Sequence, residues 1–124
     1  MSHTVSVKTQ ITEPGCIQKA ALALGYQCEI AALGKRIVEK LFESEVEGIA
    51  KVKIPTWQLP IVIAADGTLQ YDNYEGRWGD PVDLEKFKAQ YSEELSLEHW
   101  QNNGFVLESK VVYQDGTREL VFAQ

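Results

Sequence analysis

The segment "LPIVIAADGTLQYDNYE", residues 59–75, carries the clearest structural signal in the chain. It contains two extended stretches, one a continuous apolar run and the other alternating, and both patterns are typical of strands. Between them lies Asp66-Gly67, a dipeptide favoured in tight hairpin turns, where both central residues need positive φ. We therefore predict an antiparallel hairpin over residues 59–75. Pro55 and Pro60 lack a backbone N–H donor, which places the residues between them at a strand edge or in a connection.

The residues before this hairpin predict a strand, a helix, a second strand and a short helix. Residues 3–11 alternate between two faces and predict a half-buried strand. Thr12 is expected to cap a helix that stops at Gly25, and residues 26–33 predict a second strand. Residues 35–47 predict a short amphipathic helix, because apolar residues recur there at helical spacing: Ile37, Val38, Leu41 and Phe42.

The residues after the hairpin predict the longest helix and a closing hairpin. The helix starts near Asp80, ends at Asn103-Gly104 and has one apolar face, formed by Leu84, Phe87, Tyr91 and Leu95. The closing hairpin turns at Asp115-Gly116. This order predicts an α+β fold, a two-layer sandwich in which two or three helices cover a mainly antiparallel sheet. Ferredoxin-like topology is the nearest common arrangement.

Composition limits the classes of function. A chain of 124 residues with 44% hydrophobic content is expected to form a single domain over residues 1–124. Its 12 basic and 18 acidic residues give a net charge of -6, which disfavours nonspecific binding to nucleic acid or to a membrane surface. The N-terminus lacks the features of a signal peptide, and no apolar run reaches a membrane-spanning length. We expect a cytoplasmic protein.

No catalytic, cofactor or metal motif occurs in the sequence. The spacing of Cys16 and Cys28 excludes a Cys-x-x-Cys hook, and both are expected to be small buried hydrophobes. His3 lies on the apolar face of the first strand, and His99 lies where it can interact with a helix C-terminus. Glycine-rich phosphate loops and a nucleophile elbow are absent, and nothing sets the separation that a paired-carboxylate hydrolase needs. We therefore predict no cofactor and no metal.

Several stretches together resemble a known family. In order they are "MSHTVSVKTQI" (1–11), "LGY" (24–26), "LQYDNYEGRWGD" (69–80), "FKAQYSEE" (87–94) and "GFVLESKVVYQDGTRELVF" (104–122). This layout resembles the ycf35-like conserved open-reading-frame proteins of red-algal plastids and cyanobacteria, which have bacterial and phage relatives. The resemblance implies an intracellular α+β domain, in the plastid stroma if plastid-encoded, and it implies no activity. Residues 35–56 depart from the family pattern and are expected to form a divergent helical segment.

The candidate binding residues lie in and after the second strand of the hairpin: Tyr71, Asp72, Tyr74, Arg77 and Trp78. Alternation directs one tyrosine to each side of the sheet. Arg77 and Trp78 follow in a glycine-bounded bend, where they could anchor a protein interface. The alternative is that Trp78 fills the space between the hairpin and the long helix. Residues 35–47 are a second candidate surface.

Two functional hypotheses remain open. The preferred one is a noncatalytic protein-interaction or adaptor module, which docks a partner protein through the aromatic hairpin and residues 35–47. The alternative is a small-molecule-binding domain or simple hydrolase with a pocket between the sheet and the helices. Its expected lining is Tyr71, Asp72, Tyr74 and Trp78.

Overall fold

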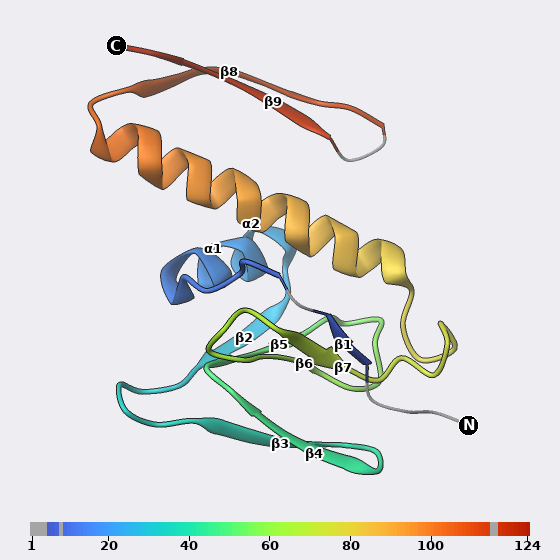
Figure 1. Ribbon diagram of the computed structural model, residues 1–124. Coiled ribbons are helices and arrows are strands. Elements are labelled where there is room, and N and C mark those ends of the chain that lie inside the picture. Colours follow the sequence, from blue (N-terminus) through green and yellow to red (C-terminus); the bar gives the residue numbers. More distant parts are fainter. Residues whose placement is uncertain (1–4, 8, 115–116) are drawn as a thin grey trace.

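The computed structural model describes residues 5–7, 9–114 and 117–124. An antiparallel five-stranded sheet, in the order β1-β7-β6-β5-β2, forms its centre. Its strands are β1 (Val5–Val7), β2 (Gln27–Ile30), β5 (Ala50–Lys53), β6 (Ile61–Ile63) and β7 (Leu69–Tyr71). Two helices, α1 (Pro14–Leu24) and α2 (Pro81–Asn102), lie together over one face of this sheet (Figure 1). The predicted α+β class is confirmed.

Two separate hairpins complete the fold. β3 (Ile37–Leu41) pairs with β4 (Ser44–Gly48), and β8 (Val106–Val112) pairs with β9 (Arg118–Ala123). The β8–β9 hairpin lies over α2 on the side away from the sheet, while β3–β4 extends from the other side of the molecule (Figure 1). The strands after α2 therefore form their own two-stranded sheet, so the ferredoxin-like topology is not shown. The predicted turn at Asp115-Gly116 lies outside the described residues.

The hydrophobic core lies between the sheet and the two helices. Each fully buried aliphatic or aromatic side chain stabilises the fold by roughly 1.5–3 kcal/mol. The core includes Cys16, Ile17, Ala20 and Ala21 of α1, Leu84, Phe87 and Tyr91 of α2, and Val52, Ile61, Ile63 and Leu69 of the sheet. Leu95, predicted on the same helical face, is 40% exposed. It is therefore not part of this core, although further along α2 the Glu98 carboxylate accepts a hydrogen bond from the buried Cys16 thiol at 3.2 Å.

The helix ends differ in how their amides are satisfied. Asp80 caps α2 as predicted, with its Oδ1 accepting from the Val82 N–H at 3.0 Å. The prediction that Thr12 caps α1 was wrong, since Glu13 is the capping residue and makes no side-chain cap bond. Instead, the N–H groups of Thr12 and Glu13 donate to the Tyr91 hydroxyl at 3.3 and 3.2 Å. A side chain of α2 thus satisfies the amides before α1.

The predicted hairpin over residues 59–75 is confirmed as β6–β7, but its turn differs from the prediction. Of the two predicted turn residues, Asp66 and Gly67, only Gly67 has a positive φ, of 90°. The Gly67 N–H donates to the Ala64 carbonyl at 2.9 Å, and the Ala64 N–H donates to the Thr68 carbonyl at 2.8 Å. This is the three-residue loop with a left-handed glycine, rather than a two-residue turn. The Thr9 hydroxyl donates to the Gly67 carbonyl at 2.5 Å, which ties the turn to the segment after β1.

Residues 35–47 form a β-hairpin, so the predicted amphipathic helix, and with it a helical segment near 35–56, was wrong. The chain turns at Phe42, which has a φ of 53°, and Leu41 pairs with Ser44. The apolar positions of this segment fit either period, but its alternating acids fit only a strand. Gly48 at the end of β4 lies directly against β6. A Cβ at this position would lie 2.3 Å from the Ile63 carbonyl oxygen, so the hairpin can pack there only with glycine.

Candidate functional site

Four side chains from two separate segments form a cluster, which we call the aromatic patch: Phe42, Tyr74, Arg77 and Trp78. Phe42 and Arg77 are exposed, and Tyr74 and Trp78 are half-buried. The rings of Tyr74 and Trp78 stack with centroids 4.9 Å apart and planes inclined by 21°. The Arg77 guanidinium carbon lies 5.1 Å from the Tyr74 ring centroid, within the range of a cation–π contact. Phe42, which is 51% exposed, meets Trp78 edge-on at 5.5 Å.

The patch contains residues of both candidate surfaces. Arg77 and Trp78 come from the loop between β7 and α2, as predicted, and Phe42 comes from the turn between β3 and β4. Tyr74 comes from the same loop, so its predicted place in the strand was wrong, because β7 ends at Tyr71. The sequence indicated residues 35–47 as a second surface but assigned them to a helix, which gave no reason to pair Phe42 with Trp78. The strand-like alternation of acids after Phe42 was the signal that could have placed this ring at a hairpin tip.

The backbone of the patch loop is strained and tightly held. Tyr74, Glu75 and Gly76 are consecutive left-handed residues, with φ values of 49°, 55° and 94°. For a non-glycine residue this conformation costs about 1–2 kcal/mol. The Asn73 carbonyl accepts from the Gly76 N–H at 3.1 Å and from the Trp78 N–H at 2.9 Å. Strain of this kind persists where the surroundings determine the backbone, and it is frequent at binding sites.

Buried polar side chains support the loop from below. Asp72 is 1% exposed, and its Oδ1 accepts from the Tyr74 N–H at 3.0 Å. Among the described residues its Oδ2 has no hydrogen-bond partner. The Asn73 amide donates to the Gly79 carbonyl at 3.2 Å. Asp72, predicted as a binding residue, therefore lies beneath the surface and positions the loop.

Trp57, rather than Trp78, is the core tryptophan of this region. Trp57 is 3% exposed and packs edge-on against Tyr71, with centroids 5.7 Å apart. A Cβ on Gly79 would lie 2.2 Å from the Trp57 indole, so the loop backbone passes directly over this ring. The half-buried Tyr71 thus contacts the core ring and is not part of the patch, while Trp78 keeps its stacked position at the surface.

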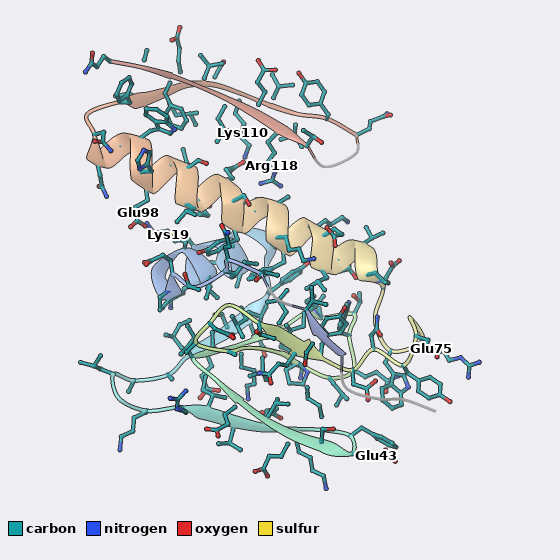
Figure 2. The ribbon with its side chains drawn as sticks, viewed as in Figure 1. Lys19, Glu43, Glu75, Glu98, Lys110 and Arg118 are labelled. Carbon is teal, nitrogen blue, oxygen red and sulfur yellow. The ribbon has the colours of Figure 1, made fainter. Side chains whose placement is uncertain are left out.

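Acidic side chains border the patch. Glu43 follows Phe42 and Glu75 follows Tyr74 in the sequence, and both side chains are exposed; Figure 2 labels them at the tip of β3–β4 and in the loop before α2. Arg77 provides the positive charge within the patch. The surface therefore offers rings and one cation inside an acidic border.

Titratable side chains elsewhere are isolated or satisfied. No group of three or more His, Cys, Asp or Glu side chains in the described part of the chain could hold a metal ion. Burial, followed by a hydrogen bond and the charge of Glu98, raises the pKa of Cys16 to about 11. Burial also raises the pKa of the half-buried Cys28. His99 is exposed and meets Trp100 edge-on at 5.1 Å, while His3 lies outside the described residues.

A second polar cluster joins α2 to the β8–β9 hairpin. The Glu93 side chain is 5% exposed. Its Oε1 forms ion pairs with Lys110 Nζ at 2.8 Å and with Arg118 Nη1 at 3.0 Å. Burial alone would raise the pKa of Glu93, but the Lys110 hydrogen bond and both cations outweigh it and lower this pKa. The hollows found along this junction are lined by residues of α2 and the hairpin, and the predicted pocket residues Tyr71, Asp72, Tyr74 and Trp78 do not line them.

Comparison with protein-family models, curated proteins and solved structures finds no match to this chain. The resemblance to the ycf35-like proteins therefore stays a prediction. Over the described residues, neither helix has the length and apolar character needed to cross a membrane.

Proposed function

We propose that this protein is a noncatalytic interaction module, an adaptor that docks a partner protein through the aromatic patch. The observation that carries the proposal is the half-buried, stacked Tyr74–Trp78 pair, flanked by the exposed Arg77 and Phe42. Trp, Tyr and Arg are the residue types that dominate binding energy at protein interfaces. Their convergence from two distant segments gives the patch the area of several side chains.

The patch is arranged for binding before a partner arrives. The rings hold one another by stacking and edge contacts, and the loop that carries them is anchored by hydrogen bonds to Asn73 and Asp72. A side chain that is already ordered loses little conformational entropy on association, which otherwise costs about 0.5–1.5 kcal/mol for each side chain immobilised. Binding through the patch therefore costs less conformational entropy than binding through mobile side chains, which favours higher affinity for the same contacts.

Charge indicates the chemistry of the partner. The acidic border of Glu43 and Glu75, on a chain of net charge -6, favours a partner surface with basic residues around an apolar centre. The apolar centre would contact Phe42 and Trp78, and the basic residues would face the two glutamates. Association through such a surface is expected to weaken as salt concentration rises.

The experiment is affinity capture of the tagged protein from lysate of its own host, followed by native mass spectrometry. Wild type is expected to retain a stoichiometric protein partner. The double variant Arg77→Ala/Trp78→Ala and the single variant Phe42→Ala are expected to lose it. Loss of a dominant interface side chain costs about 2 kcal/mol or more, which is roughly a 30-fold loss of affinity.

The fold should survive these substitutions, because the loop bonds at residues 77 and 78 are made by backbone atoms. The matched control is Tyr113→Ala, which removes an exposed aromatic side chain beyond β8, away from the patch. Circular dichroism and thermal melting would verify that each variant is folded. If the folded patch variants captured the partner as well as wild type does, the patch would not be its docking surface.

A further inference from the structure

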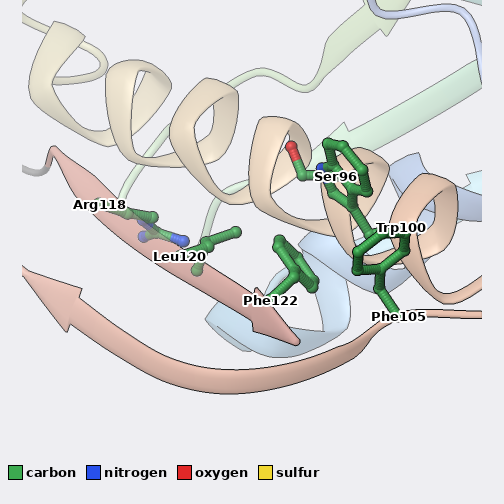
Figure 3. A pocket seen from close by; sticks show the side chains of 6 residues that line it. All are labelled: Ser96, Trp100, Phe105, Arg118, Leu120 and Phe122. Atoms are coloured by element: carbon green, nitrogen blue, oxygen red, sulfur yellow. The ribbon is translucent and has the colours of Figure 1, made fainter. Parts of the chain in front are cut away.

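An open groove runs between α2 and β9, on the side of α2 away from the sheet. Its aromatic end encloses about 450 Å³ and is lined by Ser96, Trp100, Phe105, Arg118, Leu120 and Phe122 (Figure 3). We call this end the helix–hairpin groove. Trp100 of α2 lies 5.1 Å from the Phe105 ring and 5.8 Å from the Phe122 ring, measured between centroids. The groove therefore has aromatic walls and a size in the range of small-molecule sites, about 300–1,000 Å³.

The groove has one cationic side chain in its lining, Arg118. Arg118 and Lys110 both pair with the same carboxylate, that of the buried Glu93. Glu94 joins this cluster through the Gln90 amide, which donates to it at 3.0 Å. Arg118 is the cation that lines the groove, so an anion is the ligand class that this end of the groove complements.

The guanidinium of Arg118 uses only part of its hydrogen-bonding capacity. Its Nη1 donates both to Gln90 Oε1 at 2.7 Å and to Glu93 Oε1 at 3.0 Å. Its Nε is buried and has no partner among the described residues. A buried donor without a partner is unfavourable, and it is usually explained by an ion, water or ligand. The Nε and Nη2 groups together form the planar fork that a carboxylate accepts in bidentate fashion.

We propose that the helix–hairpin groove binds a small aromatic carboxylate. The carboxylate pairs with the free edge of Arg118, and the ring of the ligand lies against Trp100, Phe105 and Phe122. The Ser96 hydroxyl, on the α2 side of the groove, supplies one further polar group. The Arg118 side chain is 15% exposed and its Nε is buried, so this pairing requires the lining side chains to shift when the ligand binds. The site shares no residue with the aromatic patch, so either proposal can fail without the other.

The test uses a matched pair of probes, naphthalene-2-carboxylate and naphthalene-2-carboxamide, which differ in charge but not in shape. Isothermal titration calorimetry of the full chain is expected to show saturable, one-to-one binding of the carboxylate. The neutral amide is expected to bind at least about tenfold more weakly, since a hydrogen bond to a charged group is markedly stronger than a neutral one. Absence of carboxylate binding at millimolar concentration, or equal affinity for both probes, would overturn the proposal.

Two variants locate the site. Ser96→Leu fills the groove, and Arg118→Lys keeps the charge beside Glu93 while removing the planar fork. Both are expected to weaken carboxylate binding about tenfold or more. The matched control is Ser109→Leu, which places the same side chain on the exposed outer side of β8, because Lys110 next to it points to Glu93. If both folded variants bound the carboxylate as tightly as Ser109→Leu does, the ligand would lie elsewhere and the assignment would be wrong.

Discussion

Gly79→Ala is the substitution whose effect the structure determines most directly. A Cβ at this position would lie 2.2 Å from the Trp57 indole carbon Cδ2. Carbon atoms in contact lie about 3.5 Å apart or more, so the ring or the loop would have to move by about 1.3 Å. Trp57 is 3% exposed and is held against Tyr71, which leaves it little room. Overpacking of a dense interior costs about 1–3 kcal/mol, and we expect the upper part of that range.

The assay is equilibrium unfolding in urea, monitored by circular dichroism. Gly79→Ala should lower the free energy of unfolding by about 2–3 kcal/mol. Gly15→Ala is the matched control, because no atom outside its chain neighbours and its own helix backbone lies within 4 Å of the added Cβ. Inside α1 that substitution should be neutral or stabilising by up to about 1 kcal/mol.

A double-mutant cycle identifies the cause of the loss. Trp57→Phe shortens the ring and also removes an indole N–H that is buried without a partner among the described residues. If the clash with Trp57 is responsible, Gly79→Ala should cost about 1 kcal/mol less in the Trp57→Phe background than in wild type. Additive effects in this cycle, or a loss below about 0.5 kcal/mol for Gly79→Ala alone, would refute the reasoning.

Three further predictions concern the helices and the β8–β9 hairpin. Glu93→Gln should lower the free energy of unfolding by about 2–3 kcal/mol, since it leaves Lys110 and Arg118 without their carboxylate. Because the folded-state pKa of Glu93 is lowered, its contribution is present above the unfolded-state pKa of about 4.3 and is lost as pH falls through the folded-state value; pH-dependent urea unfolding of wild type and variant would measure this. Cys16, buried and with a pKa of about 11, should not react with Ellman's reagent at pH 8 unless the protein is unfolded, and rapid labelling under native conditions would contradict its placement. Asp80→Ala should cost about 1 kcal/mol, measured by thermal unfolding, and Asp80→Asn should restore most of it.

Local patterns sufficed for several elements. Asp66-Gly67 between two extended stretches predicted the β6–β7 hairpin, because turn residues constrain only their neighbours. Gly25, with a φ of 76°, ends α1, and Asp80 caps α2, as their residue types predicted. The same reasoning failed at Thr12, where the Tyr91 hydroxyl satisfies the amides instead. No local pattern contains that long-range partner.

The candidate site was predicted only in part, because local patterns do not contain contacts between distant segments. The sequence indicated Tyr74, Arg77 and Trp78 by their residue types in a glycine-bounded bend, and the structure gathers them in one patch. It could not separate these residues from Asp72, which is buried, because burial depends on how the loop lies over the core. Phe42 was missed as a patch residue because it belongs to the segment whose period was misjudged.

Local sequence patterns placed most helices and strands of this protein, since hydrophobic period, capping residues and turn dipeptides act over a few neighbouring residues. Tertiary structure sets the form of residues 35–47, where the contact of Gly48 with β6 favours a hairpin over a helix. It also decided which tryptophan is buried, Trp57 rather than Trp78, and it brought Arg118 and Lys110 to one buried carboxylate. Those outcomes depend on packing between segments distant in the chain, which local spacing does not encode.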